Sequence, residues 1–242
     1  MGEESRTSRR GLILGLGGLI AIAWGWQRFG IGIRKANYSP IPGLPGWQQV
    51  VSRAVSGQGN ATSAVFLGLG DEPEVATLAA ADLCRTLYRN RGSGPPVAFF
   101  TDVNCPNCRL LLARLAGREL SITWHQLPLL GPASELGARA LEAALMQPNG
   151  EAFVMRLHSQ SLRPSPEWLA RLAGETGLDP NRLLADMQSP QVLNRLAKSR
   201  AAAATLGIWG TPGLAVGRTL VMGAVDGDIL DQVIASENPG SC

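Results

Sequence analysis

Two cysteines separated by two residues, where a predicted strand meets a predicted helix, constrain this chain more than any other feature. The apolar run at residues 97–101 (VAFFT) has the length and composition of a buried strand. The segment after Pro106 has helical apolar spacing and ends near Gly117. Since proline suits the first turn of a helix, Cys105 is expected at the helix N-terminus, with Cys108 about one turn later.

The residues leave three interpretations of this pair: half of a zinc site, two small core residues, or a redox-active dithiol. A zinc site needs four ligands, and the other cysteines and histidines offer no second paired spacing. These are Cys84, Cys242, His125 and His158. Two small core residues would fit poorly, because Pro106 lets the backbone present Cys105 at a helix terminus instead of burying it. In an exported chain, C-x-x-C at the start of a helix indicates a redox-active dithiol.

The helix terminus predicts separate roles for the two thiols. Unpaired N–H groups and the positive end of the helix dipole favour a thiolate on Cys105, the predicted nucleophile. Cys108 is expected to face inward and to attack a mixed disulfide held on Cys105. A helix terminus contributes at most about 2 kcal/mol, which lowers the thiol pKa by no more than about 1.5 units. Asn107 adds no positive charge, so a weaker oxidant is predicted than one with histidine there.

The first 37 residues carry an export or membrane signal. Arg9 and Arg10 precede an uncharged stretch at 11–27, whose 27 − 11 + 1 = 17 residues reach only the lower limit for crossing a bilayer. An uncleaved anchor and a cleaved signal peptide, with an A-x-A pattern at 21–23, both fit. Both place the bulk of the chain outside the cytoplasm, in the periplasm or its equivalent. The net charge of +3, without a basic block, argues against a nucleic-acid partner.

The remaining chain predicts an α/β domain with a helical insert. Residues 38–63 are expected to form a spacer, since three prolines and two glycines fall within 37–47. Residues 64–242 are expected to form the main domain, in the order strand, helix, strand, helical insert, hairpin and helix. A short strand at 64–69 and a helix within 72–90 are expected before the strand at 97–101, and the insert is expected at about 133–207. Three helices of the insert open with a cap residue followed by proline: Ser165-Pro166, Asp179-Pro180 and Ser189-Pro190.

A second candidate element is the Thr211-Pro212 step, which leads into the hairpin. An ordinary turn before a strand would explain the proline. A cis bond would instead expose the Thr211 backbone for pairing with an extended substrate beside Cys105.

With these motifs, residues 96–236 resemble the DsbA-like thiol-disulfide oxidoreductases of the thioredoxin superfamily. The resemblance rests on VAFFTDVNCPNCR, the long helical insert, LGIWGTP and VMGAVDGDIL. It implies a thioredoxin-like fold with helices inserted after the second strand, catalysis by Cys105 and Cys108, and a cis bond at Thr211-Pro212. It also implies that a quinone-linked membrane oxidase renews the disulfide.

One departure from the family concerns the proton acceptor for Cys108. Relatives commonly carry an acidic residue in the strand before the motif, where this chain has Phe99 and Phe100. Asp102 is a candidate proton relay if its side chain points inward, and a loop acid or helix cap otherwise.

The other two cysteines and the two histidines are predicted to have structural roles. Cys84 and Cys242 either form a second disulfide or remain a buried thiol and a loose tail. Both histidines, His125 and His158, are expected to be structural.

The sequence thus predicts a thiol-disulfide oxidoreductase that acts on cysteine pairs of exported proteins without a metal or organic cofactor. Disulfide isomerisation or reduction by the same fold is an alternative. A thiol-based copper-delivery module is the alternative from another class, because soft thiolates select Cu(I).

Overall fold

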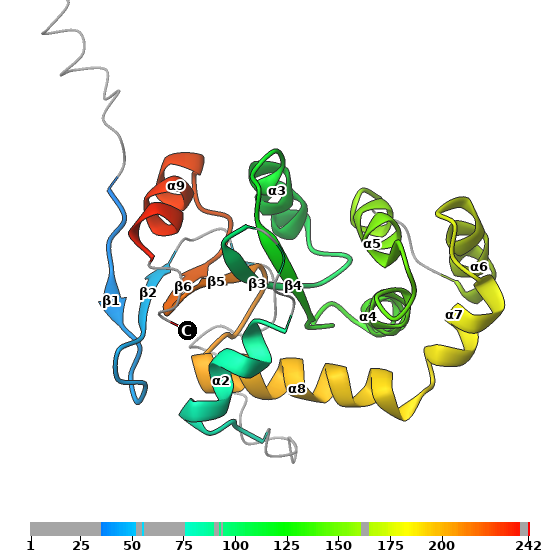
Figure 1. Cartoon of the computed structure of the whole chain (residues 1–242), viewed down its shortest axis with the longest axis horizontal. Helices are drawn as coiled ribbons and strands as arrows, with labels where there is room; N and C mark the ends of the chain where they lie inside the picture. The colour runs from blue at the N-terminus through cyan, green and yellow to red at the C-terminus, as the bar shows by residue number, and fades with distance from the viewer. Residues whose placement is uncertain are drawn as a thin grey trace, which may run out of the picture. The chain divides into compact units, whose positions relative to one another are not determined.

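A six-stranded mixed sheet forms the centre of residues 36–242 in the computed structural model (Figure 1). The structure describes residues 35–51, 55, 76–89, 92, 94–160, 165–237 and 242. In spatial order the strands are β1 (Ser39–Pro40), β2 (Gln48–Val51), β6 (Thr219–Met222), β5 (Gly213–Val216), β3 (Pro96–Thr101) and β4 (Ser121–Gln126). Strand β5 runs antiparallel to both of its neighbours, while β3 pairs with β4, and β2 with β6, in parallel.

Helices cover both faces of this sheet. The described helices are α2 (Ala80–Leu87), α3 (Pro106–Leu115), α4 (Pro132–Ala144), α5 (Gly150–His158), α6 (Pro166–Glu175), α7 (Pro180–Asp186), α8 (Pro190–Leu206) and α9 (Gly227–Ser236). Figure 1 shows α3 and α9 over one face and α2 and α8 over the other. Phe99 accordingly joins the core cluster that contains α3 and α9, and Phe100 the cluster that contains α2 and α8. Because the strand is buried on both faces, it reads as a continuous apolar run.

The helical insert lies where the sequence predicts it, as α4 to α8 between β4 and β5. Its three predicted start signals are confirmed. The side chains of Ser165, Asp179 and Ser189 each accept a backbone N–H from the first turn of the helix that follows. The predicted α/β class with a helical insert is likewise confirmed.

The predicted spacer at 38–63 differs from the structure, because its first part is folded into the sheet. Strand β2 pairs with β6 from Gln48↔Thr219 to Val51↔Met222. The preceding prolines and glycines make turns, and the Ile41 N–H donates to the Trp47 carbonyl across them. Since Ile41, Leu44 and Trp47 are buried, the segment is anchored by apolar side chains.

Two other expectations concern the N-terminal third of the chain. The helix predicted within 72–90 begins at Ala80, and residues 76–79 are not helical. The strand at 64–69 and residues 1–34 of the anchor or signal segment lie outside the described residues. None of the described helices is both long enough and apolar enough to cross a bilayer.

Candidate functional site

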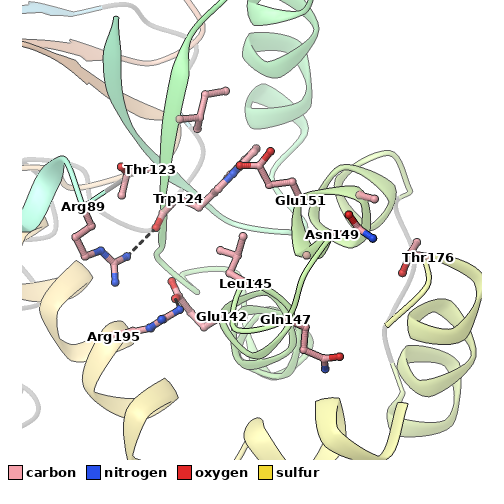
Figure 2. A pocket seen from close by; sticks show the side chains of 13 residues that line it. Arg89, Thr123, Trp124, Glu142, Leu145, Gln147, Asn149, Glu151, Thr176 and Arg195 are labelled. Atoms are coloured by element: carbon pink, nitrogen blue, oxygen red, sulfur yellow. Dashed lines mark hydrogen bonds and ion pairs between the residues drawn. The ribbon is translucent and has the colours of Figure 1, made fainter. Parts of the chain in front are cut away.

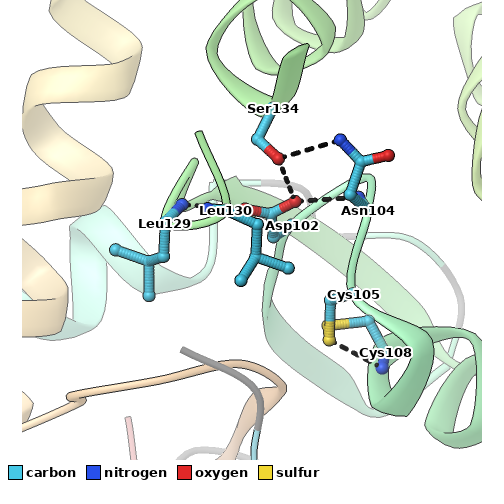
Figure 3. The surroundings of a disulfide bond; sticks show 7 residues. All are labelled: Asp102, Asn104, Cys105, Cys108, Leu129, Leu130 and Ser134. Atoms are coloured by element: carbon cyan, nitrogen blue, oxygen red, sulfur yellow. Dashed lines mark hydrogen bonds between the residues drawn. A yellow bond between two sulfur atoms is a disulfide. The ribbon is translucent and has the colours of Figure 1, made fainter. Parts of the chain in front are cut away.

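Cys105 and Cys108 lie at the N-terminus of α3, where the sequence predicts them, and are joined by a disulfide (Figure 3). Cys105 is the N-cap residue, with extended backbone angles of φ −79° and ψ 113°, and Pro106 opens the first turn. The Cys108 N–H donates to the Cys105 Sγ at 2.9 Å. This amide is one of the N–H groups that no helical carbonyl can satisfy. The sulfur of Cys105 therefore occupies the position at which a helix stabilises negative charge.

Both cysteines are buried, and for Cys105 this corrects an expectation. Cys105 is 0% exposed and Cys108 is 1% exposed. The sequence predicts that Cys108 faces inward and that Cys105 is presented at the helix N-terminus instead of being buried. Both residues belong to the core cluster that also contains Val103 and Leu111, because the loop before α3 packs inward. Proline at the first helical position thus fixes the helix start but does not expose the cap residue.

The peptide bond between Thr211 and Pro212 is cis, as predicted. Gly213, the next residue, pairs with Phe100 in the antiparallel β3–β5 register. Continuing that register places Pro212 level with Thr101, at the end of β3 from which the cysteine loop leaves. The fold thus brings the two predicted site segments to the same end of the central sheet, although Thr211 itself is buried.

Asp102 follows β3, is 1% exposed, and has both carboxylate oxygens occupied (Figure 3). Its Oδ1 accepts the Asn104 N–H at 2.8 Å and the Ser134 hydroxyl at 2.7 Å. Its Oδ2 accepts the N–H groups of Leu129 and Leu130 at 2.7 and 3.0 Å. These bonds connect the cysteine loop to the start of α4. The side chain therefore points inward, which is the condition on which the proton-relay prediction depends, and the relay stays a prediction. A cap for the helix that follows is not formed by Asp102, because Cys105 is the N-cap of α3.

Aromatic rings occupy the two positions of β3, 99 and 100, at which the resemblance leads one to expect an acidic residue. Phe99 lies against Trp124 with ring centroids 5.5 Å apart, and Phe100 stacks on His125 at 4.7 Å. His125 is held between the Ser199 hydroxyl and the Leu87 carbonyl, each 3.1 Å from a ring nitrogen. Burial, with a smaller contribution from the Arg89 charge, lowers the pKa of His125 to about 3. The residue is structural, as expected.

His158 is the second buried histidine, and its ring stacks on Trp124 with centroids 5.7 Å apart. Neither of its ring nitrogens has a hydrogen-bond partner among the described residues. Burial, followed by the Arg109 charge, lowers the pKa of His158 to about 4. The ring is therefore neutral above that pH.

Replacing His158 with phenylalanine is expected to make the protein more resistant to acid. The folded-state pKa of about 4 lies below the unfolded value of 6.5, so the unfolded chain binds an extra proton as the pH falls between them. Wild-type stability should therefore decrease through this window, by a total on the order of 3 kcal/mol. Phenylalanine keeps the stacking and does not titrate. Unfolding in guanidinium at pH 7, 5.5 and 4 should show the variant's advantage growing as the pH falls.

The matched control for this prediction is His125→Phe. That change removes the hydrogen-bond partner of the Ser199 hydroxyl and of the Leu87 carbonyl, so it should destabilise the protein already at pH 7. A difference between His158→Phe and wild type that stays constant from pH 7 to 4 would contradict the assignment of a neutral, buried His158.

The residues considered for a zinc site do not come together. Cys84 and Cys242 form a second disulfide with a Cα–Cα distance of 5.3 Å, which is one of the two alternatives that the sequence leaves open. His125 and His158 occupy the separate environments described above. Across the part of the chain that the structure describes, no cluster of three or more histidine, cysteine or acidic side chains is arranged to hold a metal.

A cavity of about 870 Å³ beside β4 is a feature that the sequence analysis missed (Figure 2). Glu142 and Arg195 line this cavity and form an ion pair, with 3.7 Å between Glu142 Oε2 and Arg195 Nη1. Arg89 also lines it and donates to the Trp124 carbonyl at 3.2 Å. Burial raises the pKa of Glu142, while the charges of Arg89 and Arg195 oppose this shift. The cysteines are not among the lining residues. Since the lining side chains come from several distant helices and strands, no local pattern identifies them.

Comparison with known proteins yields a family match and several similar structures. A model of the DsbA-like thioredoxin domain matches residues 135–235. A thioredoxin-like oxidoreductase from Silicibacter pomeroyi DSS-3 is 32% identical, with a TM-score of 0.57, over 62% of this chain and 95% of its own. None of the curated proteins compared with the chain matches it.

Two more distant structures share the fold. The thiol-disulfide exchange protein alpha-DsbA2 from Wolbachia pipientis is 20% identical, with a TM-score of 0.56, over 64% of this chain and 91% of its own. ScsC from Proteus mirabilis is 21% identical, with a TM-score of 0.56, over 72% of this chain and 87% of its own.

Proposed function

The chain belongs to the DsbA-like family of thiol-disulfide oxidoreductases, and on this premise we propose that Cys105 and Cys108 are its redox pair and that it exchanges disulfides with cysteine pairs of exported proteins. The observation that carries the proposal is the sulfur of Cys105 at the N-cap of α3, accepting the Cys108 N–H. Such a position stabilises the thiolate, which is the reactive form of the thiol.

The proposed reaction is a two-step exchange. A substrate thiolate attacks the Cys105 Sγ, which breaks the 105–108 bond and releases Cys108 as a thiolate that takes up a proton. A second substrate thiolate then attacks the substrate sulfur of this mixed disulfide and releases the Cys105 thiolate. The substrate loses two electrons and gains a disulfide, while the enzyme becomes a dithiol. A membrane redox partner is proposed to accept those electrons and to restore the 105–108 bond.

Substrate access requires motion at the site, because Cys105 has no exposed surface in the disulfide form. We place the substrate beside the Thr211-Pro212 step. The support is the β3–β5 register, which brings this step to the end of β3 from which the cysteine loop leaves. An extended substrate pairing with backbone at that point would run past Cys105.

The proposed location is outside the cytoplasm, with residues 1–37 as an anchor or a cleaved signal. The redox chemistry fits this location, since disulfides persist in oxidising compartments and the chain carries two of them. The catalytic domain is proposed to include the strands at 39–51 in addition to residues 64–242, because β2 pairs directly with β6.

The reduction potential of the 105–108 pair tests the direction of exchange. We propose net oxidation of substrates, which requires a potential closer to about −120 mV than to about −270 mV. Equilibration with glutathione buffers, followed by alkylation and mass measurement, gives this value. A potential near −270 mV would assign the chain to the reductases instead.

The pKa of the Cys105 thiol in the reduced protein is expected to lie only mildly below the ordinary thiol value, because burial opposes the effect of the helix N-terminus. The dipole of α3 and the Cys108 amide lower it, but Pro106, Asn107 and Cys108 add no positive charge in the first turn. Thiolate absorbance can be titrated in the Cys108→Ser variant, where the 84–242 pair stays oxidised and Cys105 is the single free thiol. A pKa below about 4 would refute this expectation.

A further inference from the structure

We propose that Asp102 is a positioning residue for the redox pair, which fixes the cysteine loop against the first turn of the helical insert. This inference rests on the proposed function of Cys105 and Cys108. The four hydrogen bonds of its carboxylate, described above, are called the Asp102 clamp.

The Asp102 clamp joins the cysteine loop to residues 129–134, about 30 positions further along the chain. One oxygen binds the loop through the Asn104 N–H, and also binds Ser134 in the first turn of α4. The other oxygen binds two consecutive amides of the β4–α4 connection, at Leu129 and Leu130. The Asn104 amide closes the arrangement by donating to the Ser134 hydroxyl at 3.1 Å. A carboxylate is the side chain suited to this position, because every neighbour that it meets is a donor.

The clamp acts on Cys105 through one covalent turn of backbone. The Asp102 carbonyl accepts the Cys105 N–H at 3.1 Å, so residues 102–105 form a closed turn. At one end of this turn the side chain of Asp102 is fixed, and at the other end stands the N-cap of α3. A shift of the carboxylate is therefore transmitted to the sulfur.

Val103 also connects the cysteine loop to α4, by close packing against Gly137. A Cβ atom added at Gly137 of α4 would lie 2.7 Å from the Val103 Cγ1, so only glycine admits the loop at this distance. Asp102 and Asn104 thus hold the turn against α4 by hydrogen bonds to Ser134, and Val103 holds it there by apolar packing. Hydrogen bonds buried at such a junction contribute strongly to a single loop conformation.

The test uses Asp102→Asn, Ser134→Ala and the double variant. Asparagine keeps the volume, but it turns an NH₂ group toward N–H and O–H donors that need an acceptor. We expect kcat for exchange with a small peptide disulfide to fall about tenfold to hundredfold, because displacements of about 1 Å have effects of this size. Ser134→Ala should lower kcat about threefold to tenfold. The double variant should resemble Asp102→Asn alone, since both changes disrupt one network.

The pH dependence separates positioning from proton transfer. A positioning residue should leave the shape of the pH–rate profile unchanged in both single variants. A profile flattened in Asp102→Asn but retained in Ser134→Ala would overturn the proposal in favour of a proton relay. An unchanged kcat in Asp102→Asn would overturn it outright.

Asp179→Asn is the matched control for stability. This residue also caps a helix, accepting the N–H groups of Asn181 and Arg182 on α7. It should lower the melting temperature without changing kcat at a temperature where all variants are folded. An equal loss of kcat in Asp179→Asn and Asp102→Asn would show that general destabilisation is responsible. If Asp102→Asn does not fold, Ser134→Ala carries the test, and wild-type kcat in that variant overturns the proposal.

Failure of the proposed function is distinguishable from failure of this inference. A wild-type chain that exchanges no faster than its Cys105→Ser variant would refute the function. The alkylation rate of reduced Cys105 would then still report on the clamp, with a changed rate expected in Asp102→Asn and Ser134→Ala and a wild-type rate in Asp179→Asn.

Discussion

Replacing Cys105 with serine is expected to reduce disulfide exchange with a protein substrate to the uncatalysed rate. A thiolate is the group that attacks a disulfide, and a serine hydroxyl does not do so near neutral pH. Serine also cannot form the disulfide that a substrate thiolate would attack. Cys108 cannot compensate, because it lies one turn into α3 and lacks the N-cap position that stabilises a thiolate. The rate of oxidative refolding of a reduced, cysteine-rich protein gives the measurement.

The chain contains its own control, the Cys84→Ser/Cys242→Ser variant. This variant also lacks one disulfide, but Cys84 and Cys242 pack against a different core cluster from the one that contains Cys105 and Cys108. It should keep the turnover of the wild type at a temperature where it is folded. Equal loss of turnover in the two variants would contradict the assignment of the chemistry to the 105–108 pair.

The largest expected effect on stability comes from removing the 84–242 disulfide. This bond closes a loop with a sequence separation of 158 residues, and a cross-link over a loop of that length restricts the unfolded chain strongly. We expect the free energy of unfolding of Cys84→Ser/Cys242→Ser to fall by about 2 to 5 kcal/mol. Guanidinium denaturation followed by circular dichroism measures the change.

The Cys105→Ser/Cys108→Ser variant shows how much free energy of unfolding is lost when the other disulfide is removed. Its disulfide spans a sequence separation of only 3 residues, so the chain-entropy contribution is much smaller. A loss of stability as large as that of the 84–242 variant would contradict the division into one structural and one reactive disulfide.

The sequence predicted the parts of the fold that local patterns encode. Proline after a cap residue marks the starts of α3, α6, α7 and α8, because the missing N–H and the fixed φ suit only the first helical turn. The continuous apolar run at Val97–Phe100 marks a central strand. The spacing of Cys105 and Cys108 follows from one turn of helix.

Non-local contacts account for what the sequence did not predict. The pairing of β2 with β6 joins Gln48 to Thr219, and no pattern within either segment specifies that partner. Burial of Cys105 depends on the packing of the loop against α4. The orientation of Asp102 depends on donors supplied by Leu129, Leu130 and Ser134, about 30 residues further along the chain. Residue type alone left open whether Asp102 is a proton relay, a solvated loop acid or a cap for the following helix.

The central claim, that Cys105 is the sulfur that reacts with substrate, is tested most directly by trapping. In the Cys108→Ser variant the resolving thiol is absent, so a mixed disulfide formed at the helix N-terminus should accumulate. Mass spectrometry of peptides, after incubation with a protein disulfide under non-reducing conditions, should find the substrate cysteine bonded to Cys105. Substrate bonded to Cys84 or Cys242, or no adduct while exchange continues at the wild-type rate, would contradict the account.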